Sequence, residues 1–281
     1  MFDAQPSAGV RELGQGTEEF KAVRISAFGV RIQIRAPAEI LAHIHRSIVP
    51  GAEFGDPEPA DATISVRVNE SASGQPLYEI RENSAVLGTQ AGLQATMSVV
   101  ESWTQLTVAT LAKELVFVHA GVVGWRNKAI VIPGRSLSGK STLVLALVKA
   151  GADYYSDEYA MFDSEGRVHP YWRLPKLKAA SGQKAADSSL GGVLSGPPPR
   201  PTPLGSVLIC RYKPEEPRQP RRLTCGETLL GLLDNTVPLR LRPEQAVRTL
   251  SRAVANAQGF EAARGEAEVF ARQVLSLFDR T

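Results

Sequence analysis

One eight-residue segment constrains the fold more than any other feature of the sequence. Gly134-Arg135-Ser136-Leu137-Ser138-Gly139-Lys140-Ser141 fits the pattern G-x-x-x-x-G-K-[ST] at every fixed position. An apolar run at residues 129–132 precedes it, and a second one at residues 143–148 follows it. A strand that passes through such a loop into a helix is the setting of a phosphate-binding loop. Because chance gives the pattern in roughly 1% of chains of this length, the segment predicts an α/β fold with a phosphate-binding loop, or P-loop.

Each fixed position of the P-loop has a physical purpose. Glycines let backbone amides turn inward without a clash at Cβ, and those amides form an anion cradle together with the helix N-terminus. We expect Lys140 to bring its charge to the β- and γ-phosphates of ATP, and the Ser141 hydroxyl to ligate Mg²⁺. The expected nucleotide-binding segment runs from Gly134 to Thr142. The alternative is a glycine-rich connection that binds nothing.

Two adjacent carboxylates, Asp157 and Glu158, follow the short strand expected after the P-loop helix. Phosphoryl transfer needs a carboxylate for Mg²⁺ and one that receives the acceptor's proton. Ligands collect at the carboxyl ends of strands in such sheets, so we expect Asp157 to be a catalytic base and both residues to serve the metal. The alternative is two solvated acids at a strand end. It is stronger for Glu158, because neighbouring residues of an extended chain point to opposite faces.

One histidine is a third candidate. His119 ends a short apolar strand expected at residues 115–118, which we predict to pair beside the P-loop strand. That pairing would bring the imidazole near the phosphates as part of the catalytic site. The alternative is a satisfied core histidine. His43, His45 and His169 have no comparable placement.

The pattern of apolar residues divides the chain into three parts. Residues 1–20 are polar and Gly-, Gln- and Glu-rich, and we expect a flexible tail. Residues 21–114 predict a small α/β domain of unassigned role. It has strand pairs, a helix over residues 37–48 and a long helix over residues 91–114. Residues 115–281 form the expected P-loop domain.

The last hundred residues combine loops with regular elements. We expect a strand at residues 207–210 and a Pro- and Arg-rich loop at residues 213–222. Three helices are expected, at residues 225–233, 243–256 and 266–278. The Gly-, Ser- and Pro-rich segment 181–204 is interpreted as a cover over the acceptor site, with an inert spacer as the alternative.

Composition excludes several classes of protein. Hydrophobic residues make up 43% of the 281, enough for a substantial core, and the formal net charge of +3 is too small to indicate a nucleic-acid partner. Two cysteines make neither a disulfide framework nor a metal site. No apolar run reaches the ~18 residues of a membrane span. The polar start lacks the features of a signal peptide, so we expect a cytoplasmic protein without a membrane partner. Self-association into a homo-oligomer is compatible with all of this.

Four segments together carry a family resemblance. Residues 119–122, 132–141 and 156–160 resemble the catalytic domain of HPr kinase/phosphorylase, and more closely the bacterial HPr-kinase-related proteins. Residues 170–175 with Lys178 are similar to a Pro-Arg-Pro…Lys stretch of the related proteins. The resemblance implies a P-loop kinase core similar to that of phosphoenolpyruvate carboxykinase, with the small N-terminal α/β domain outside it.

The same resemblance implies roles for individual residues. Lys140 and Ser141 would bind the nucleotide and Mg²⁺, and Asp157 would take the position of the catalytic carboxylate. Glu158 would stand where the family has a second aspartate, and His119 where it has a histidine near the phosphates. The implied function is an ATP-dependent kinase that phosphorylates a hydroxyl on a peptide, a protein or a small molecule.

Two other functions stay open at this point. The Arg-Gly-containing signature and the C-terminal Pro-Gly-Arg-Asn stretch of HPr kinase/phosphorylases are missing. Their absence favours a nucleotide-binding regulatory module with little turnover. A nucleic-acid-dependent ATPase rests only on the Arg-rich segment 211–222, which has no interleaved aromatic residues. The sequence identifies neither the phosphate acceptor nor a preference between ATP and GTP.

Overall fold

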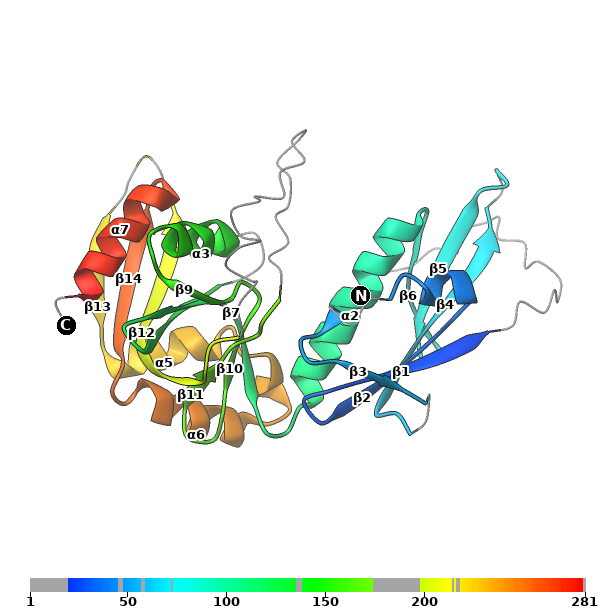
Figure 1. Ribbon diagram of the computed structural model, residues 1–281, viewed down its shortest axis with the longest axis horizontal. Coiled ribbons are helices and arrows are strands. Elements are labelled where there is room, and N and C mark those ends of the chain that lie inside the picture. The colour runs from blue at the N-terminus through cyan, green and yellow to red at the C-terminus, as the bar shows by residue number, and fades with distance from the viewer. Residues whose placement is uncertain are drawn as a thin grey trace, which may run out of the picture. The chain divides into compact units, whose positions relative to one another are not determined.

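The computed structural model describes residues 20–44, 48–56, 59–71, 73–134, 138–173, 198–213, 215 and 218–279. The chain divides into two compact units, Met1–Ala112 and Lys113–Thr281, called here the N-terminal and the C-terminal unit. Each unit combines a β-sheet with helices, which confirms the predicted α/β class (Figure 1). Residues 1–19 of the expected tail and residues 181–197 of the expected cover lie outside the described residues, whereas residues 202–204 of that segment belong to a strand.

The N-terminal unit is a six-stranded sheet with one long helix along a face (Figure 1). Its strands pair in the order β3-β1-β2-β4-β5-β6. They are β1 (Lys21–Ala27), β2 (Val30–Ala36), β3 (Glu53–Gly55), β4 (Ala62–Glu70), β5 (Pro76–Glu82) and β6 (Ala85–Gln90), and the helices are α1 (Ala38–Leu41) and α2 (Leu93–Leu111). Alternate residues of β2 and β4 are buried, as the period of a strand requires. The helix predicted over residues 37–48 is wrong in length, because α1 makes a single turn that buries only Ile40.

The C-terminal unit is built on an eight-stranded sheet in the order β11-β10-β7-β8-β12-β14-β13, with β9 paired to β7. Its strands are β7 (Val116–Trp125), β8 (Lys128–Pro133), β9 (Asp153–Ser156), β10 (Tyr159–Phe162), β11 (Arg167–His169), β12 (Thr202–Tyr212), β13 (Arg218–Leu223) and β14 (Gln258–Arg264). Its helices are α3 (Lys140–Lys149), α5 (Cys225–Leu233), α6 (Pro243–Val254) and α7 (Ala267–Phe278), with a 3₁₀ turn η2 (Val237–Arg240). Strands β8, β12 and β14 run parallel, so their carboxyl ends share one edge.

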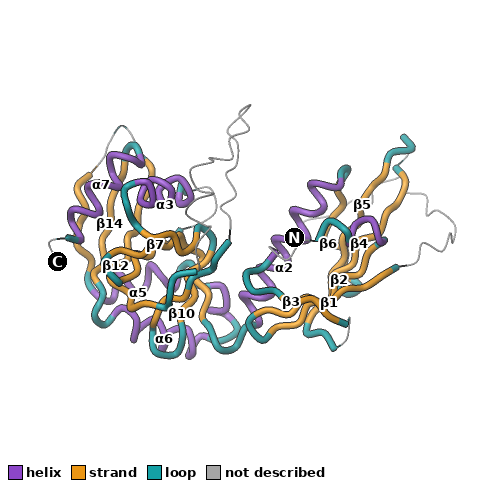
Figure 2. The backbone as a smooth tube through the Cα atoms, in the orientation of Figure 1, coloured by secondary structure: helices purple, strands orange, loops and turns teal. Residues whose placement is uncertain are grey.

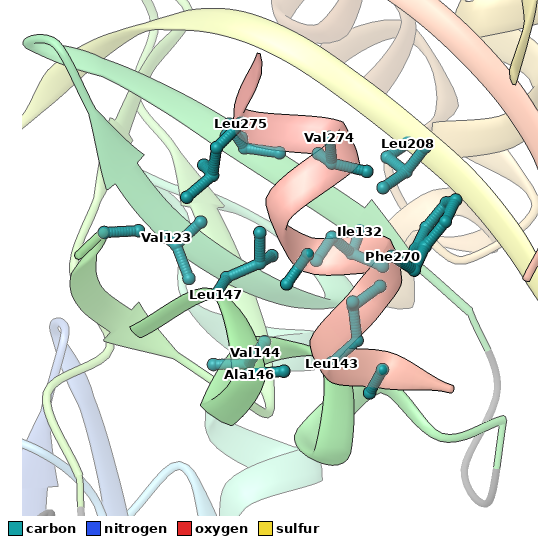
Figure 3. Packing of buried hydrophobic residues seen from close by; sticks show 14 of the residues in the cluster. Val123, Ile132, Leu143, Val144, Ala146, Leu147, Leu208, Phe270, Val274 and Leu275 are labelled. Atoms are coloured by element: carbon teal, nitrogen blue, oxygen red, sulfur yellow. The ribbon is translucent and has the colours of Figure 1, made fainter. Parts of the chain in front are cut away.

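Helices cover both faces of this sheet. α3 and α7 lie on one face, and α5 and α6 lie on the other (Figures 1 and 2). Leu143 and Leu147 of α3 meet Phe270 and Val274 of α7 over the sheet (Figure 3). Gly121 of β7 lets α3 come close, since an added Cβ would lie 2.5 Å from Cγ2 of Val144. Packing therefore fixes the P-loop helix against the strands that flank the loop. No helix among the described residues is both long and apolar enough to cross a bilayer.

The strand that carries His119 is longer than predicted. β7 continues to Trp125, so His119 lies within the strand and does not end it. The remainder of β7 pairs with β8 through the turn Arg126-Asn127, where φ is 50° and 61°. Positive φ at both turn residues matches the twist of a two-residue hairpin. Arginine seldom adopts a positive φ, which explains why the sequence did not reveal this turn.

Two further strands were not predicted. The loop expected at residues 213–222 contains β13, and the unassigned stretch between the last two predicted helices contains β14. The β14 sequence QGFEAAR is poor in β-branched and aromatic residues, so its propensity for a strand is low. It is a strand because β12 and β13 flank it on both sides and supply its hydrogen bonds.

We predict that Leu147→Ala lowers the free energy of unfolding by about 2–5 kcal/mol, because Leu147 is fully buried between α3 and α7 and a cavity would remain. Leu230→Ala is the matched control, since Leu230 of α5 is 61% exposed. Urea denaturation followed by circular dichroism measures both. Equal losses in the two variants would contradict the assigned core.

Candidate active site

The P-loop leaves the sheet at the carboxyl end of β8. Gly134 follows the strand, Gly139 is the N-cap of α3, and Lys140 opens the helix. Gly139 has a φ of 81°, and an added Cβ there would contact Nη2 of Arg264, so only glycine fits. No side chain of the described residues caps the N-terminus of α3, so its first amides are available to an anion. Arg135, Ser136 and Leu137 lie outside the described residues.

Lys140 is the cation of this site. Its side chain is nearly buried, with 7% exposed. Burial lowers the pKa of the ammonium, and the carboxylates of Glu158 and Asp157 oppose that effect. The ammonium is therefore within electrostatic reach of both predicted carboxylates.

Asp157 lies under the first turn of α3. Burial raises the pKa of its carboxyl, while hydrogen bonds from the side chains of Ser141 and Tyr154 act in the opposite direction. The Tyr154 hydroxyl donates a bifurcated hydrogen bond to Oδ1 of Asp157 at 3.2 Å and to the Arg173 carbonyl oxygen at 2.8 Å. A partly buried carboxylate of raised basicity beside an anion site is suited to accept a proton.

Glu158 reaches the same site because the chain is not extended there. β9 and β10 both pair with β7, and the chain bends between them at Asp157 and Glu158. The Ser156 hydroxyl oxygen accepts the backbone N–H groups of Glu158 and Tyr159, each at 3.0 Å. This local turn takes Asp157 and Glu158 out of the extended conformation, and both carboxylates act electrostatically on Lys140.

His119 joins the loop to Glu158. Its Nδ1 lies 2.8 Å from the carbonyl oxygen of Gly134, and a carbonyl only accepts, so Nδ1 carries a proton. Nε2 lies 3.4 Å from Oε1 of Glu158. The backbone N–H of Gly134 donates to the His119 carbonyl oxygen at 3.2 Å. Gly134 is thus bonded to both the side chain and the backbone of His119, which holds the start of the loop against β7.

The structure brings together most of the predicted site residues. Gly134, Gly139, Lys140, Ser141, His119, Asp157 and Glu158 meet at one edge of the sheet, with Ser138 beside Gly134. Thr142, also predicted to bind the nucleotide, is exposed. Lys178 lies outside the described residues. Arg173 is the last described residue of its segment, and burial lowers the pKa of its guanidinium to about 10.

The oxygen atoms of Ser141, Asp157 and Glu158 suit a hard cation such as Mg²⁺. The described residues contain no group of three or more His, Cys, Asp or Glu residues placed to hold a metal ion. A nucleotide-bound Mg²⁺ needs fewer, because phosphates and water fill most of its octahedron. The donor set therefore fits a metal that arrives with a nucleotide.

Sequence reasoning missed the residues on the other side of the loop. Arg264 of β14, 3% exposed, donates from Nη2 to the Gly139 carbonyl oxygen at 3.1 Å. Burial raises the pKa of the Cys210 thiol to about 11, and neighbouring Arg264 and Lys140 oppose the shift. One feature of the sequence indicated β14: residues 257–265 separate two predicted helices, and in an alternating β/α pattern a strand lies between consecutive helices.

Comparison with known proteins adds little. No protein-family model and no curated protein matches the chain. Among solved structures, the chain is similar to the HPr(Ser) kinase/phosphatase from Coxiella burnetii, with 12% sequence identity and a TM-score of 0.31. The similarity covers 58% of this chain and 94% of that chain. At this TM-score the relationship is distant, and neither the fold nor the site described above rests on it.

The two cysteines should differ sharply in reactivity. The thiolate is the nucleophile, and a pKa of about 11 leaves Cys210 protonated at pH 8, whereas Cys225 is exposed at the start of α5. We predict that iodoacetamide at pH 8 modifies the native protein at Cys225 and reaches Cys210 only after unfolding. Peptide mass spectrometry measures the two sites. Rapid labelling of Cys210 in the native protein would contradict its burial beside the loop.

Proposed function

We propose that this protein is an ATP-dependent phosphotransferase that transfers the γ-phosphoryl group to a hydroxyl of a peptide, a protein or a small molecule. One observation carries the proposal: a nearly buried lysine opens the helix that follows the glycine-rich loop, within electrostatic reach of the carboxylates of Asp157 and Glu158. Burying charged groups costs free energy, because they lose their contact with water. A loop that only connected a strand to a helix would gain nothing in return for that cost.

The described residues fit a bound Mg-ATP. The amides that begin α3 and the Lys140 ammonium are donors for the phosphate oxygens. Ser141, Asp157 and Glu158 are the residues that would hold Mg²⁺. When bound, Mg²⁺ supplies positive charge that neutralises the β- and γ-phosphate oxygens.

Asp157 is proposed as the base of the transfer step. Its carboxylate takes the proton of the acceptor hydroxyl while the acceptor oxygen bonds to the γ-phosphorus. The bond between that phosphorus and the β–γ bridging oxygen breaks, and its electron pair leaves with ADP. The Ser141 and Tyr154 hydrogen bonds hold the carboxylate in place. His119, fixed by its bond to Gly134, keeps Glu158 beside the loop.

Lys140→Ala should remove most of the affinity for ATP and all transfer, because it deletes the cation that neutralises the phosphates. Lys149→Ala, at the last turn of the same helix, is the matched control and should bind normally. Equilibrium titration with a fluorescent ATP analogue measures both. Normal affinity in a folded Lys140→Ala protein would refute the nucleotide site.

Asp157→Asn should bind nucleotide and lose transfer by about 10²-fold or more, since a general base contributes about 10²–10⁴. Release of ADP, with and without candidate hydroxyl acceptors, measures the rate. Water is itself an acceptor, so the basal rate should fall as well. Asp153→Asn, at the exposed start of β9, is the control.

Two outcomes would count against catalysis by Asp157. Transfer at the wild-type rate in Asp157→Asn would make the carboxylate structural. Tight nucleotide binding by the wild type without turnover on any acceptor would favour the regulatory module.

A further inference from the structure

The P-loop has two flanks, and only one carries the carboxylates. β7 pairs with β8 on one side and, through β9 and β10, brings Asp157 and Glu158 to the loop. β12 pairs with β8 on the opposite side, and β14 follows it. Because β8, β12 and β14 are parallel, the last residues of β12 and β14 emerge at the same edge as the loop.

Those last residues are Tyr212 and Arg264, which are register partners. The Arg264 guanidinium is buried and donates from Nη2 to the Gly139 carbonyl oxygen at 3.1 Å. Its Cζ atom lies 5.1 Å from the centre of the Tyr212 ring. A single guanidinium group therefore spans the space between the P-loop and the ring.

Tyr212 is fixed in orientation although it is half exposed. Its side chain is 50% exposed, and its hydroxyl donates to Oε1 of Glu266, the N-cap of α7, at 2.9 Å. Arg264 lies over the ring as a cation–π partner. An aromatic ring with two such restraints loses little conformational entropy when a second flat group stacks on it.

We propose that Tyr212 stacks against the base of the nucleotide whose phosphates bind the P-loop. The nucleoside then lies over the carboxyl ends of β12 and β14, and the phosphoryl acceptor approaches from the β7 side. This assignment rests on the proposed function, since it requires a nucleotide at the loop. It is favoured because Asp157 and Glu158 occupy the β7 flank, whereas the β12 flank presents an aromatic ring beside the loop. Every base offers a π-face to such a ring.

The test compares ATP with inorganic tripolyphosphate, which has the phosphates and no nucleoside. Isothermal titration with Mg²⁺ present measures the affinity of each for the wild type, Tyr212→Ala and Tyr212→Phe. We expect Tyr212→Ala to weaken ATP binding about tenfold, in the range of base–aromatic stacking, and to leave tripolyphosphate binding unchanged. Tyr212→Phe keeps the ring and should keep most of the affinity for ATP. Tyr212→Leu, which keeps apolar bulk without a π-face, should behave as Tyr212→Ala.

Three results would overturn the assignment. ATP affinity unchanged in Tyr212→Ala and Tyr212→Leu would place the base elsewhere. An equal loss for ATP and tripolyphosphate would mean that Tyr212 acts through Arg264 on the loop. An effect confined to the Michaelis constant of the acceptor would assign the ring to the acceptor. Failure of the wild type to bind both ligands is a different result, because it would refute the proposed function itself.

Discussion

The burial of one ammonium group governs the arrangement of the C-terminal unit around its P-loop. Removing the charge of Lys140 from water is unfavourable unless opposite charges approach it closely. Asp157 and Glu158 provide them, and they reach the loop only because the Ser156 hydroxyl bends the chain between β9 and β10. The long strand β7 supports this bend, since both β9 and β10 pair with it. Charge compensation thus ties the loop, the bend and the central strand into one unit.

Features encoded in short stretches of sequence could be predicted. The α/β class follows from strand-like alternation beside helical periodicity, and the strand and helix expected on either side of the glycine-rich segment are β8 and α3. Asp157 was expected at the carboxyl end of a strand, and β9 ends one residue before it. The strand pairs expected in residues 21–114 include β1 and β2, which turn at Phe28 and Gly29, where glycine at positive φ marks the turn.

Features that depend on partners distant in sequence could not be predicted. β14 has a poor strand sequence and takes its conformation from β12 and β13. Arg264 faces Gly139 only through the register that places it beside Tyr212. The sequence left open whether Glu158 faces away from Asp157, as it would on an extended strand, and the bend that two hydrogen bonds to the Ser156 side chain stabilise was not visible in it. In each case tertiary contacts outweigh the local preference of the chain.

Gly121 has a consequence for how this protein tolerates change. Its missing side chain sets the spacing between β7 and α3, and the helix carries Lys140 and Ser141 at the end nearest to it. An alanine there would push Val144 away and carry the first turn of α3 with it, away from Asp157. The core could absorb one extra methyl group at modest cost in stability, while the loop and carboxylates would lose their alignment. A side chain at this position would therefore disturb the loop before it unfolded the protein, so the spacing set by one missing methyl group matters more to the site than to the core.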